Sequence, residues 1–267
     1  MTAESDLGQV FRHAGVAEAY RHRPPYPAEV FSILQELTVD IPPTVLDLGA
    51  GEGALARPIA AWADSVDAVE RSAAMVAAGR RRPGGRRENL RWITGTAESA
   101  TPPGPYALIT AGASLHWMSW PVLMPRLAGA LSSRGVLAIV EHGPRDLPWR
   151  AAIVEVIQRH SRNPSFNPRF SLVEALRERG FFIPAGHAQT APVVFRQSIA
   201  DYVEQFHSTA SLAREHMHPD EAAAFRAAVS EAVAPWADQG MLELPIVADI
   251  DWGRPAAGLS GQQPVRS

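Results

Sequence analysis

The stretch that most constrains this chain is TVLDLGAGEGA, at residues 44–54. It opens with a short apolar run, formed by Val45, Leu46 and Leu48, of the kind that is buried on both faces of a parallel sheet. Glycines then occupy alternate positions in the turn that follows, namely Gly49, Gly51 and Gly53. Glycine adopts positive φ angles and lets a ligand approach the backbone, and the next residues, LARPIAAWA, predict a helix. Because the N–H groups that open a helix favour an anionic or polar group, the stretch predicts a ligand-binding strand–turn–helix unit.

The spacing of the glycines and two neighbouring acids narrow the choice of ligand. The dinucleotide fingerprint is G-x-G-x-x-G, whereas this chain has G-x-G-x-G, one residue shorter. Asp47 precedes the turn and Glu52 lies inside it. Each carboxylate would repel a pyrophosphate by roughly 1 kcal/mol at about 4 Å in water. S-adenosylmethionine (SAM) has no phosphate and carries a sulfonium and an ammonium group, so SAM is the ligand that these residues favour.

VLDLGAGEG resembles the first motif of class I SAM-dependent methyltransferases, and further stretches up to about residue 145 match that family in order. The resemblance implies an α/β fold, a Rossmann-like methyltransferase sandwich. Its sheet would be seven-stranded and mostly parallel with an antiparallel last strand, and a helical lid would be added. The resemblance also implies SAM as the cofactor. The cofactor contacts that it implies in this stretch come from Asp47, Gly49, Ala50, Gly51 and Gly53.

Composition excludes several kinds of chemistry. All 25 basic residues are arginine and there is no cysteine, which excludes Schiff-base lysines, cysteine nucleophiles, disulfides and thiolate zinc sites. The net charge of −3 exerts no general pull on nucleic acid or anionic membrane, so neither is expected as a partner. No signal peptide or long apolar span is recognisable, and we expect a cytoplasmic monomer or homodimer. The histidines and acids of REHMHPDE (214–221) lack metal-ligand spacing, so no metal site is expected.

The length of 267 residues fits one domain with embellishments. We expect four segments: an N-terminal arm and first helix (1–43), a SAM-binding core (44–145), the remainder of the sheet with an inserted helical lid (146–253), and a disordered tail (254–267). The hydrophobic pattern predicts helices over 28–37, 55–63, 120–131, 148–160, 171–179, 199–207 and 219–236. It predicts strands that begin at residue 44 and over 65–70, 90–93, 106–110, 135–140 and 241–250, and a sixth strand over 181–191 with its continuation over 193–195.

Glu70 ends the predicted strand over 65–70, 21 residues after Gly49. A carboxylate at that place can accept hydrogen bonds from both hydroxyls of a ribose, and the alternative is a solvated acid. Arg71 and Met75 follow as further cofactor contacts, and Met75 could pack on the adenine or on the core. Three more residues resemble the family's adenine-lining stretch, in which Thr96 replaces the usual aspartate: Thr96, Ala97 and Glu98.

Near the N-terminus, Tyr20, Arg23 and Tyr26 lie in the pattern Y-x-x-R-P-x-Y-P, which resembles the arm of the trans-aconitate methyltransferase-like group. The resemblance implies that this arm closes over SAM, that Tyr20 and Arg23 contact the cofactor and that Tyr26 lines the substrate site. An arginine is suited to bind the methionine carboxylate with two parallel hydrogen bonds. The alternative is an arm that only covers the sheet.

Ala111 to Met118 follows the strand over 106–110, and ligands bind beyond the carboxyl ends of such strands. Ala111 is therefore a cofactor candidate, and Ser114, His116 and Trp117 are substrate-lining candidates. His116-Trp117 resembles a pair in the same methyltransferase group, in which the histidine could act as a general base or orient a substrate oxygen. The alternative is a structural histidine. Weaker base candidates are Glu141 and His142, and His207 is a further substrate-lining candidate.

Arg80 to Arg87 holds five arginines around a Pro-Gly-Gly turn. No aromatic residues alternate with these arginines, so a solvated helix end is favoured over a nucleic-acid contact.

The sequence thus predicts a SAM-dependent methyltransferase that acts on a small molecule, possible acceptors being a carboxylate or hydroxyl of a natural-product metabolite. N-methylation, a SAM-binding enzyme that catalyses cyclisation, and an NAD-dependent oxidoreductase are the alternatives.

Overall fold

The computed structural model describes residues 18–163, 167 and 170–258. The chain divides into two compact units, which are described separately. The core unit comprises Ala28–Glu141, Ser171–Thr190 and the chain from Ala248 onward. The helical unit comprises the chain up to Pro27, His142–Phe170 and Ala191–Val247.

The strands form one sheet with the order β3-β2-β1-β4-β5-β8-β6, and β7 pairs with β8 outside this path. Their bounds are β1 Thr44–Leu48, β2 Ser65–Glu70, β3 Leu90–Thr94, β4 Tyr106–Gly112, β5 Leu131–Pro144, β6 Phe182–Gln189, β7 Val193–Ser198 and β8 Met241–Pro255. Strands β1 to β5 pair in parallel, and β8 is antiparallel to both β6 and β7. The predicted α/β class and the mostly parallel sheet with an antiparallel last strand are therefore confirmed.

The prediction of seven strands is wrong, because the described residues form eight. The predicted sixth strand over 181–191 and its continuation over 193–195 are two separate strands, β6 and β7, which pair with different parts of β8. The interruption covers residues 190–192 and includes Pro192, which has no N–H group to continue a ladder. Strand β8 also reaches Pro255, so the first two residues of the predicted tail lie in a strand. Residues 259–267 of that tail lie outside the described residues.

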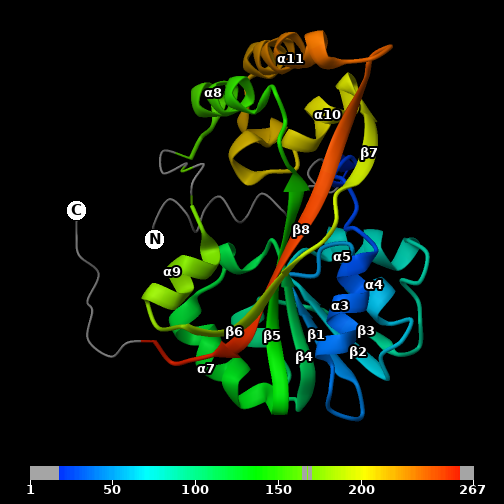
Figure 1. Cartoon of the computed structure of the whole chain (residues 1–267), viewed down its shortest axis with the longest axis vertical. Coiled ribbons are helices and arrows are strands. Elements are labelled where there is room, and N and C mark those ends of the chain that lie inside the picture. Colours follow the sequence, from blue (N-terminus) through cyan, green and yellow to red (C-terminus); the bar gives the residue numbers. More distant parts are fainter. Residues whose placement is uncertain (1–17, 164–166, 168–169, 259–267) are drawn as a thin grey trace. The chain divides into compact units, whose positions relative to one another are not determined.

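The helices of the core unit cover both faces of the sheet (Figure 1). They are α3 Glu29–Leu37, α4 Ala56–Ile59, α5 Ala73–Arg81, α6 Ala97–Ala100, α7 Trp120–Ala130 and α9 Leu172–Glu178, with a 3-10 turn η2 at Leu115–Trp117. Leu46 and Leu48 of β1 pack in one buried cluster with Leu127 of α7 and Leu176 of α9. Figure 1 draws α3, α4 and α5 together on the other side of the strands. Helix α4 is shorter than the predicted 55–63.

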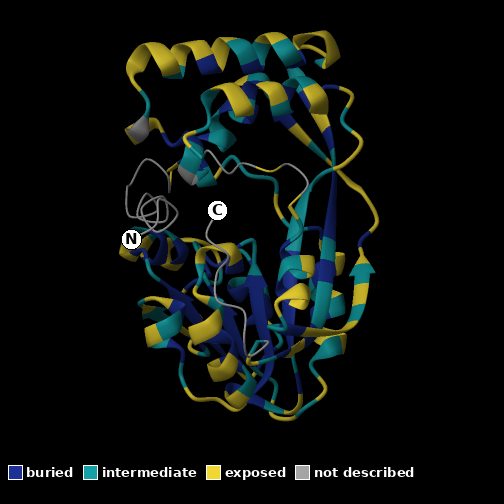
Figure 2. Ribbon diagram, turned by 90° about the vertical axis from the view of Figure 1, so that its left-hand side faces the viewer, coloured by how far each residue is buried: buried dark blue, intermediate teal, exposed yellow. Residues whose placement is uncertain are grey.

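The helical unit has its own apolar core. It contains α8 Arg150–His160, α10 Ile199–Phe206, α11 Pro219–Val233, the 3-10 turns η3 Ala210–Leu212, η4 Arg214–His216 and η5 Ala234–Trp236, and strand β7. Trp149, Tyr202 and Phe225 pack in one cluster with residues of β8. Figure 2 shows that the outward faces of these helices are exposed. This pattern of buried and exposed faces is what amphipathic helices around a shared core require.

The REHMHPDE segment starts helix α11. The side chain of His218 caps the helix, and the Glu221 carboxylate accepts a hydrogen bond from the His218 N–H at 3.0 Å. No group of three histidines and acids that could hold a metal occurs among the residues placed in the structure. None of the helices in the described residues is both long and apolar enough to cross a bilayer.

Candidate cofactor site

The glycine turn lies between β1 and α4 in the core unit. Its three glycines all have positive φ angles: Gly49 at 64°, Gly51 at 57° and Gly53 at 80°. A Cβ on Gly49 would lie 2.6 Å from the Cβ of Ser114, so only glycine fits there. Ser114 is itself fixed, because its hydroxyl donates to the Leu48 carbonyl at 2.7 Å. The turn is therefore held in a defined shape.

Replacing Gly49 with alanine is expected to lower the free energy of unfolding by about 2 kcal/mol, because a left-handed backbone disfavours a Cβ and the new methyl group would clash with Ser114. Urea unfolding measures this change. Gly129→Ala in helix α7 is the matched control, because a Cβ there meets nothing within 4 Å. An unchanged stability of Gly49→Ala would show that the turn is not held in this shape.

Glu70 stands at the carboxyl end of β2, and its side chain is only 7% exposed. Oε2 accepts a hydrogen bond from the Gly51 N–H at 2.9 Å, and Oε1 accepts one from the Ser72 N–H at 2.7 Å. Burial raises the pKa of Glu70, and the hydrogen bonds from Ser72 and Gly51 partly oppose that rise. Each carboxylate oxygen keeps acceptor capacity beyond its backbone donor, so a pair of hydroxyl groups could bind here.

Asp47 precedes the turn in β1 and is 1% exposed. Its carboxylate accepts hydrogen bonds from the Thr110 hydroxyl at 2.8 Å and from the Ala56 N–H at 3.2 Å. Burial raises its pKa to about 7, against the lowering effect of the two hydrogen bonds, and the nearby charge of Glu70 raises it further. These contacts tie β1 to β4 and to the first turn of α4. Asp47 thus fixes the strand before the glycine turn and the helix after it.

The other predicted cofactor residues of the core unit lie on the elements that follow. Met75 is 2% exposed, and a Cβ on Gly51 would lie 3.4 Å from its Cε atom. The buried Nε atom of Arg71 has no hydrogen-bond partner among the residues that the structure describes. Ala97 is buried, whereas the Thr96 hydroxyl lies 2.9 Å from that of Ser99. Glu98 accepts a hydrogen bond from the Ser119 N–H at 2.7 Å, next to the start of α7.

The segment that follows β4 contains residues predicted to line the site of the methyl acceptor. Ala111 is buried in β4. His116 and Trp117 are exposed on η2, and their ring centroids lie 4.7 Å apart. Ser114 is buried under the glycine turn through its bond to Leu48. The core unit therefore brings the glycine turn and the predicted acceptor segment together at Gly49 and Ser114.

The two base candidates on β5 differ in surroundings. Glu141 is half-buried and is the last residue of the core unit in that strand. His142 begins the next part of the helical unit, and its Nε2 donates a hydrogen bond to the Pro24 carbonyl at 2.9 Å. Its buried Nδ1 has no partner within the described ranges, and its ring lies 3.9 Å from that of Tyr26. Burial lowers the pKa of His142, and the positive charge of Arg23 lowers it further.

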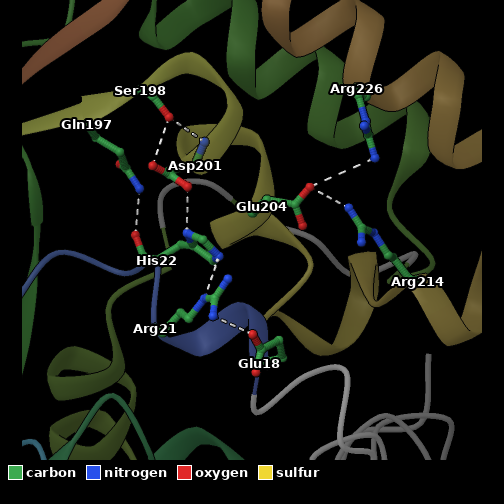
Figure 3. Close-up of polar contacts among 9 residues, drawn as sticks. All are labelled: Glu18, Arg21, His22, Gln197, Ser198, Asp201, Glu204, Arg214 and Arg226. Carbon is green, nitrogen blue, oxygen red and sulfur yellow. Dashed lines mark hydrogen bonds and ion pairs between the residues drawn. The ribbon is translucent and has the colours of Figure 1, made fainter.

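The arm residues make their contacts inside the helical unit. Asp201 of α10 pairs with His22 at 2.9 Å, and the Gln197 side chain donates to the His22 carbonyl at 2.6 Å (Figure 3). Next to them, Arg23 donates from Nε to the Ser208 hydroxyl at 2.7 Å. Its guanidinium carbon lies 4.4 Å from the centroid of the Tyr20 ring. The arm is therefore anchored to α10 and to the turn that follows it.

His207 follows α10 and is 3% exposed. Its Nδ1 donates to the Leu212 carbonyl at 2.8 Å, and burial lowers its pKa. The Nε2 atom is buried without a partner in the described part of the chain. His207 also lines a cavity of about 460 Å³ within the helical unit.

The comparisons with known proteins agree with this geometry. Residues 45–135 match a family model described as a methyltransferase domain. This part of the chain is therefore similar to methyltransferase domains. No curated protein matches the sequence significantly.

Several solved structures resemble most of this chain. One is a protein from Anaeromyxobacter dehalogenans, provisionally described as a type II methyltransferase: 20% identity, TM-score 0.62, 87% of this chain and 97% of that chain covered. A second is the YcgJ protein of Bacillus subtilis, with 18% identity, TM-score 0.53, and 85% and 98% covered. A third is a SAM-dependent methyltransferase from Thiobacillus denitrificans in complex with S-adenosylhomocysteine, with 16% identity, TM-score 0.52, and 90% and 97% covered. The chain therefore shares the Rossmann-like fold of these methyltransferases.

Three residues that matter to the methyltransferase domain or to the arm were missed in the sequence. Thr110 holds Asp47, Ser72 holds Glu70 and caps α5, and Ser208 holds Arg23. Ser72 could have been found, because a serine just before a predicted helix is a typical N-cap. Thr110 is aligned with Asp47 across β1 and β4, and this register follows only from the sheet order.

Proposed function

We propose that this chain transfers the methyl group of SAM to a small-molecule acceptor, with O-methylation of a carboxylate or hydroxyl favoured. The observation that carries the proposal is Glu70. Two backbone N–H groups hold its buried carboxylate at the carboxyl end of β2, next to a glycine turn whose shape excludes side chains. A ribose hydroxyl pair is the ligand group that such a carboxylate suits.

The chemistry of SAM fits the residues present in the core unit. Glu70 would bind the ribose hydroxyls, and the glycine turn would leave room for the methionine portion. The unpartnered Nε of Arg71 is a donor for a polar group of the cofactor, and buried Met75 supplies an apolar contact. Thr96, Ala97, Glu98 and Ala111 would line the adenine side. In the helical unit, Tyr20 and Arg23 are assigned to the methionine carboxylate.

Bound SAM supplies an electrophilic methyl group on a positively charged sulfur. The chain's own task is to hold the acceptor atom within about 3–3.5 Å of that group and in line with it, which accounts for most of the acceleration. A carboxylate acceptor needs no base, whereas a hydroxyl must lose a proton. Ser114, Trp117, Tyr26 and His207 are proposed to line the acceptor, with His116 as base or orienting group and with Glu141 and His142 as further bases.

His142 has the tautomer that a base requires. Because the Pro24 carbonyl can only accept, the proton lies on Nε2 and the Nδ1 lone pair stays available. Because the pKa of His142 is lowered from 6.5, the ring stays neutral at pH values at which an ordinary histidine begins to be protonated. It could therefore accept a proton from an acceptor at neutral pH.

Replacing His116 and His142 one at a time is expected to identify the base. His116→Ala should lower turnover and leave SAM affinity intact, and unchanged turnover with every tested acceptor would remove His116 from the mechanism. If His142 is the base, turnover of a hydroxyl acceptor rises with pH through a midpoint below 6.5. That rise should disappear in His142→Gln and persist in His116→Ala. Initial rates across pH provide the measurement.

The narrower assignment to the trans-aconitate methyltransferase-like group is supported by the arm pattern and by the His-Trp pair. Release of S-adenosylhomocysteine in a panel of carboxylate, hydroxyl and amine acceptors tests the proposed function. Product formation without that release would instead favour cyclisation or another reaction that uses only the sulfonium charge. Methylated amine alone would favour N-methylation.

A further inference from the structure

A cluster of arginines lies on the core unit where α5 ends and the chain returns to β3. All five arginines are exposed, and together with Pro83 and Gly84 they line a shallow cavity of about 580 Å³. They are Arg80, Arg81, Arg82, Arg86 and Arg87. We refer to these residues as the arginine cluster. The proposed methyl transfer makes no use of it.

The turn that carries the arginine cluster is fixed. A Cβ on Gly85 would lie 1.9 Å from the Gly79 carbonyl oxygen, so glycine is required there. The Trp92 indole donates to the Gly85 carbonyl at 2.9 Å, and Arg57 donates to the Pro83 carbonyl at 3.0 Å. The backbone between the arginines is thus held by three neighbouring elements. A ligand that binds the guanidinium groups would not have to order this backbone first.

The charges of the cluster are mostly uncompensated. Arg82 pairs with Glu52 at 3.0 Å. Elsewhere in the cluster, no carboxylate of the described residues lies within ion-pair distance of a guanidinium, and Arg86 donates only to the Arg80 carbonyl at 3.3 Å. Four like charges around one cavity repel one another, and an anion that bridges them removes this repulsion.

The chemistry of the cluster selects the anion. Guanidinium groups bind phosphate oxygens with paired hydrogen bonds, and several of them around one cavity suit a ligand with more than one phosphate. The cavity has no aromatic lining on which a base could stack, and the net charge of −3 does not favour a long polyanion. We propose that the arginine cluster is a binding site for a small polyphosphate group, such as that of a nucleoside di- or triphosphate.

Calorimetric titration of the full chain with inorganic tripolyphosphate tests this site. The variant is Arg81→Gln/Arg87→Gln, and the control is Arg126→Gln/Arg159→Gln, which removes the same charge from exposed positions outside the cluster. We expect saturable binding that weakens as the ionic strength rises. Affinity should fall by roughly tenfold for each arginine removed from the cluster, since each supplies a charged hydrogen bond. The control should keep wild-type affinity.

Equal loss in both variants would overturn the proposal, because general charge would then explain the binding. Absence of tripolyphosphate binding to the wild-type chain would also overturn it. So would tight binding of a short single-stranded RNA together with no response to tripolyphosphate, which would make the cluster a nucleic-acid contact. ATP and tripolyphosphate competing for the same site would support it. None of these results depends on methyl transfer, so the site and the proposed function can fail separately.

Discussion

Replacing Glu70 with alanine is expected to weaken SAM binding by more than tenfold while the protein stays folded. The carboxylate is proposed to accept hydrogen bonds from two ribose hydroxyls, and a hydrogen bond to a charged group contributes about 1.5–3 kcal/mol. The substitution also leaves the N–H groups of Gly51 and Ser72 without their acceptor, so the turn loses an anchor. Isothermal titration calorimetry with SAM measures the change.

Two further variants make the Glu70 result specific. Glu70→Gln keeps one carbonyl acceptor in the same place and should bind SAM with intermediate affinity. Glu88→Ala removes an exposed acid and should bind like the wild type. A Glu70→Ala protein that melts normally and binds SAM as tightly as the Glu88→Ala control would show that Glu70 does not hold the ribose.

The second large effect is expected in the pH dependence of stability. Burial raises the pKa of Asp47 from 3.8 to about 7, so the folded state binds a proton that the unfolded state has already lost. Binding of this proton therefore stabilises the folded state fully below about pH 4. This stabilisation falls as pH rises and is lost by about pH 7, a decline of about 4 kcal/mol.

Asp47→Asn isolates this contribution, because the amide has no carboxyl proton to lose. Between about pH 4 and about pH 7, the free energy of unfolding of the wild type should fall by about 4 kcal/mol relative to that of the variant. Urea unfolding at a series of pH values measures it. Asp64→Asn, at an exposed position, is the control and should keep the wild-type profile. A difference that does not change with pH would mean that Asp47 is ionised in the folded protein throughout.

Much of the fold could be predicted because its signals are local. The apolar runs of β1, β2 and β4 and the glycines between β1 and α4 have the pattern of buried parallel strands with a turn. The number of strands could not be predicted, because β6 and β7 differ only in which part of β8 they pair with. Pro192 marks a break in the sequence, but the part of β8 with which each strand pairs becomes visible only in the structure.

The candidate site was predictable where its residues lie next to each other in the sequence. Glu70 and the glycine turn were found by spacing, and the structure joins them through the Gly51 N–H. The hydrogen-bond partner of Asp47 could not be predicted, because Thr110 lies 63 residues away in β4, the strand that pairs with β1. The contact of Arg23 with Ser208 spans 185 residues and is likewise absent from any local pattern.

We propose above all that the carboxyl edge of the core unit's parallel strands binds SAM. Calorimetric titration of the wild-type chain with SAM, S-adenosylhomocysteine and NADH, each in turn, tests it most directly. We predict saturable heat with SAM and with S-adenosylhomocysteine, and none with NADH. Heat with NADH and none with the two sulfur compounds would contradict the claim.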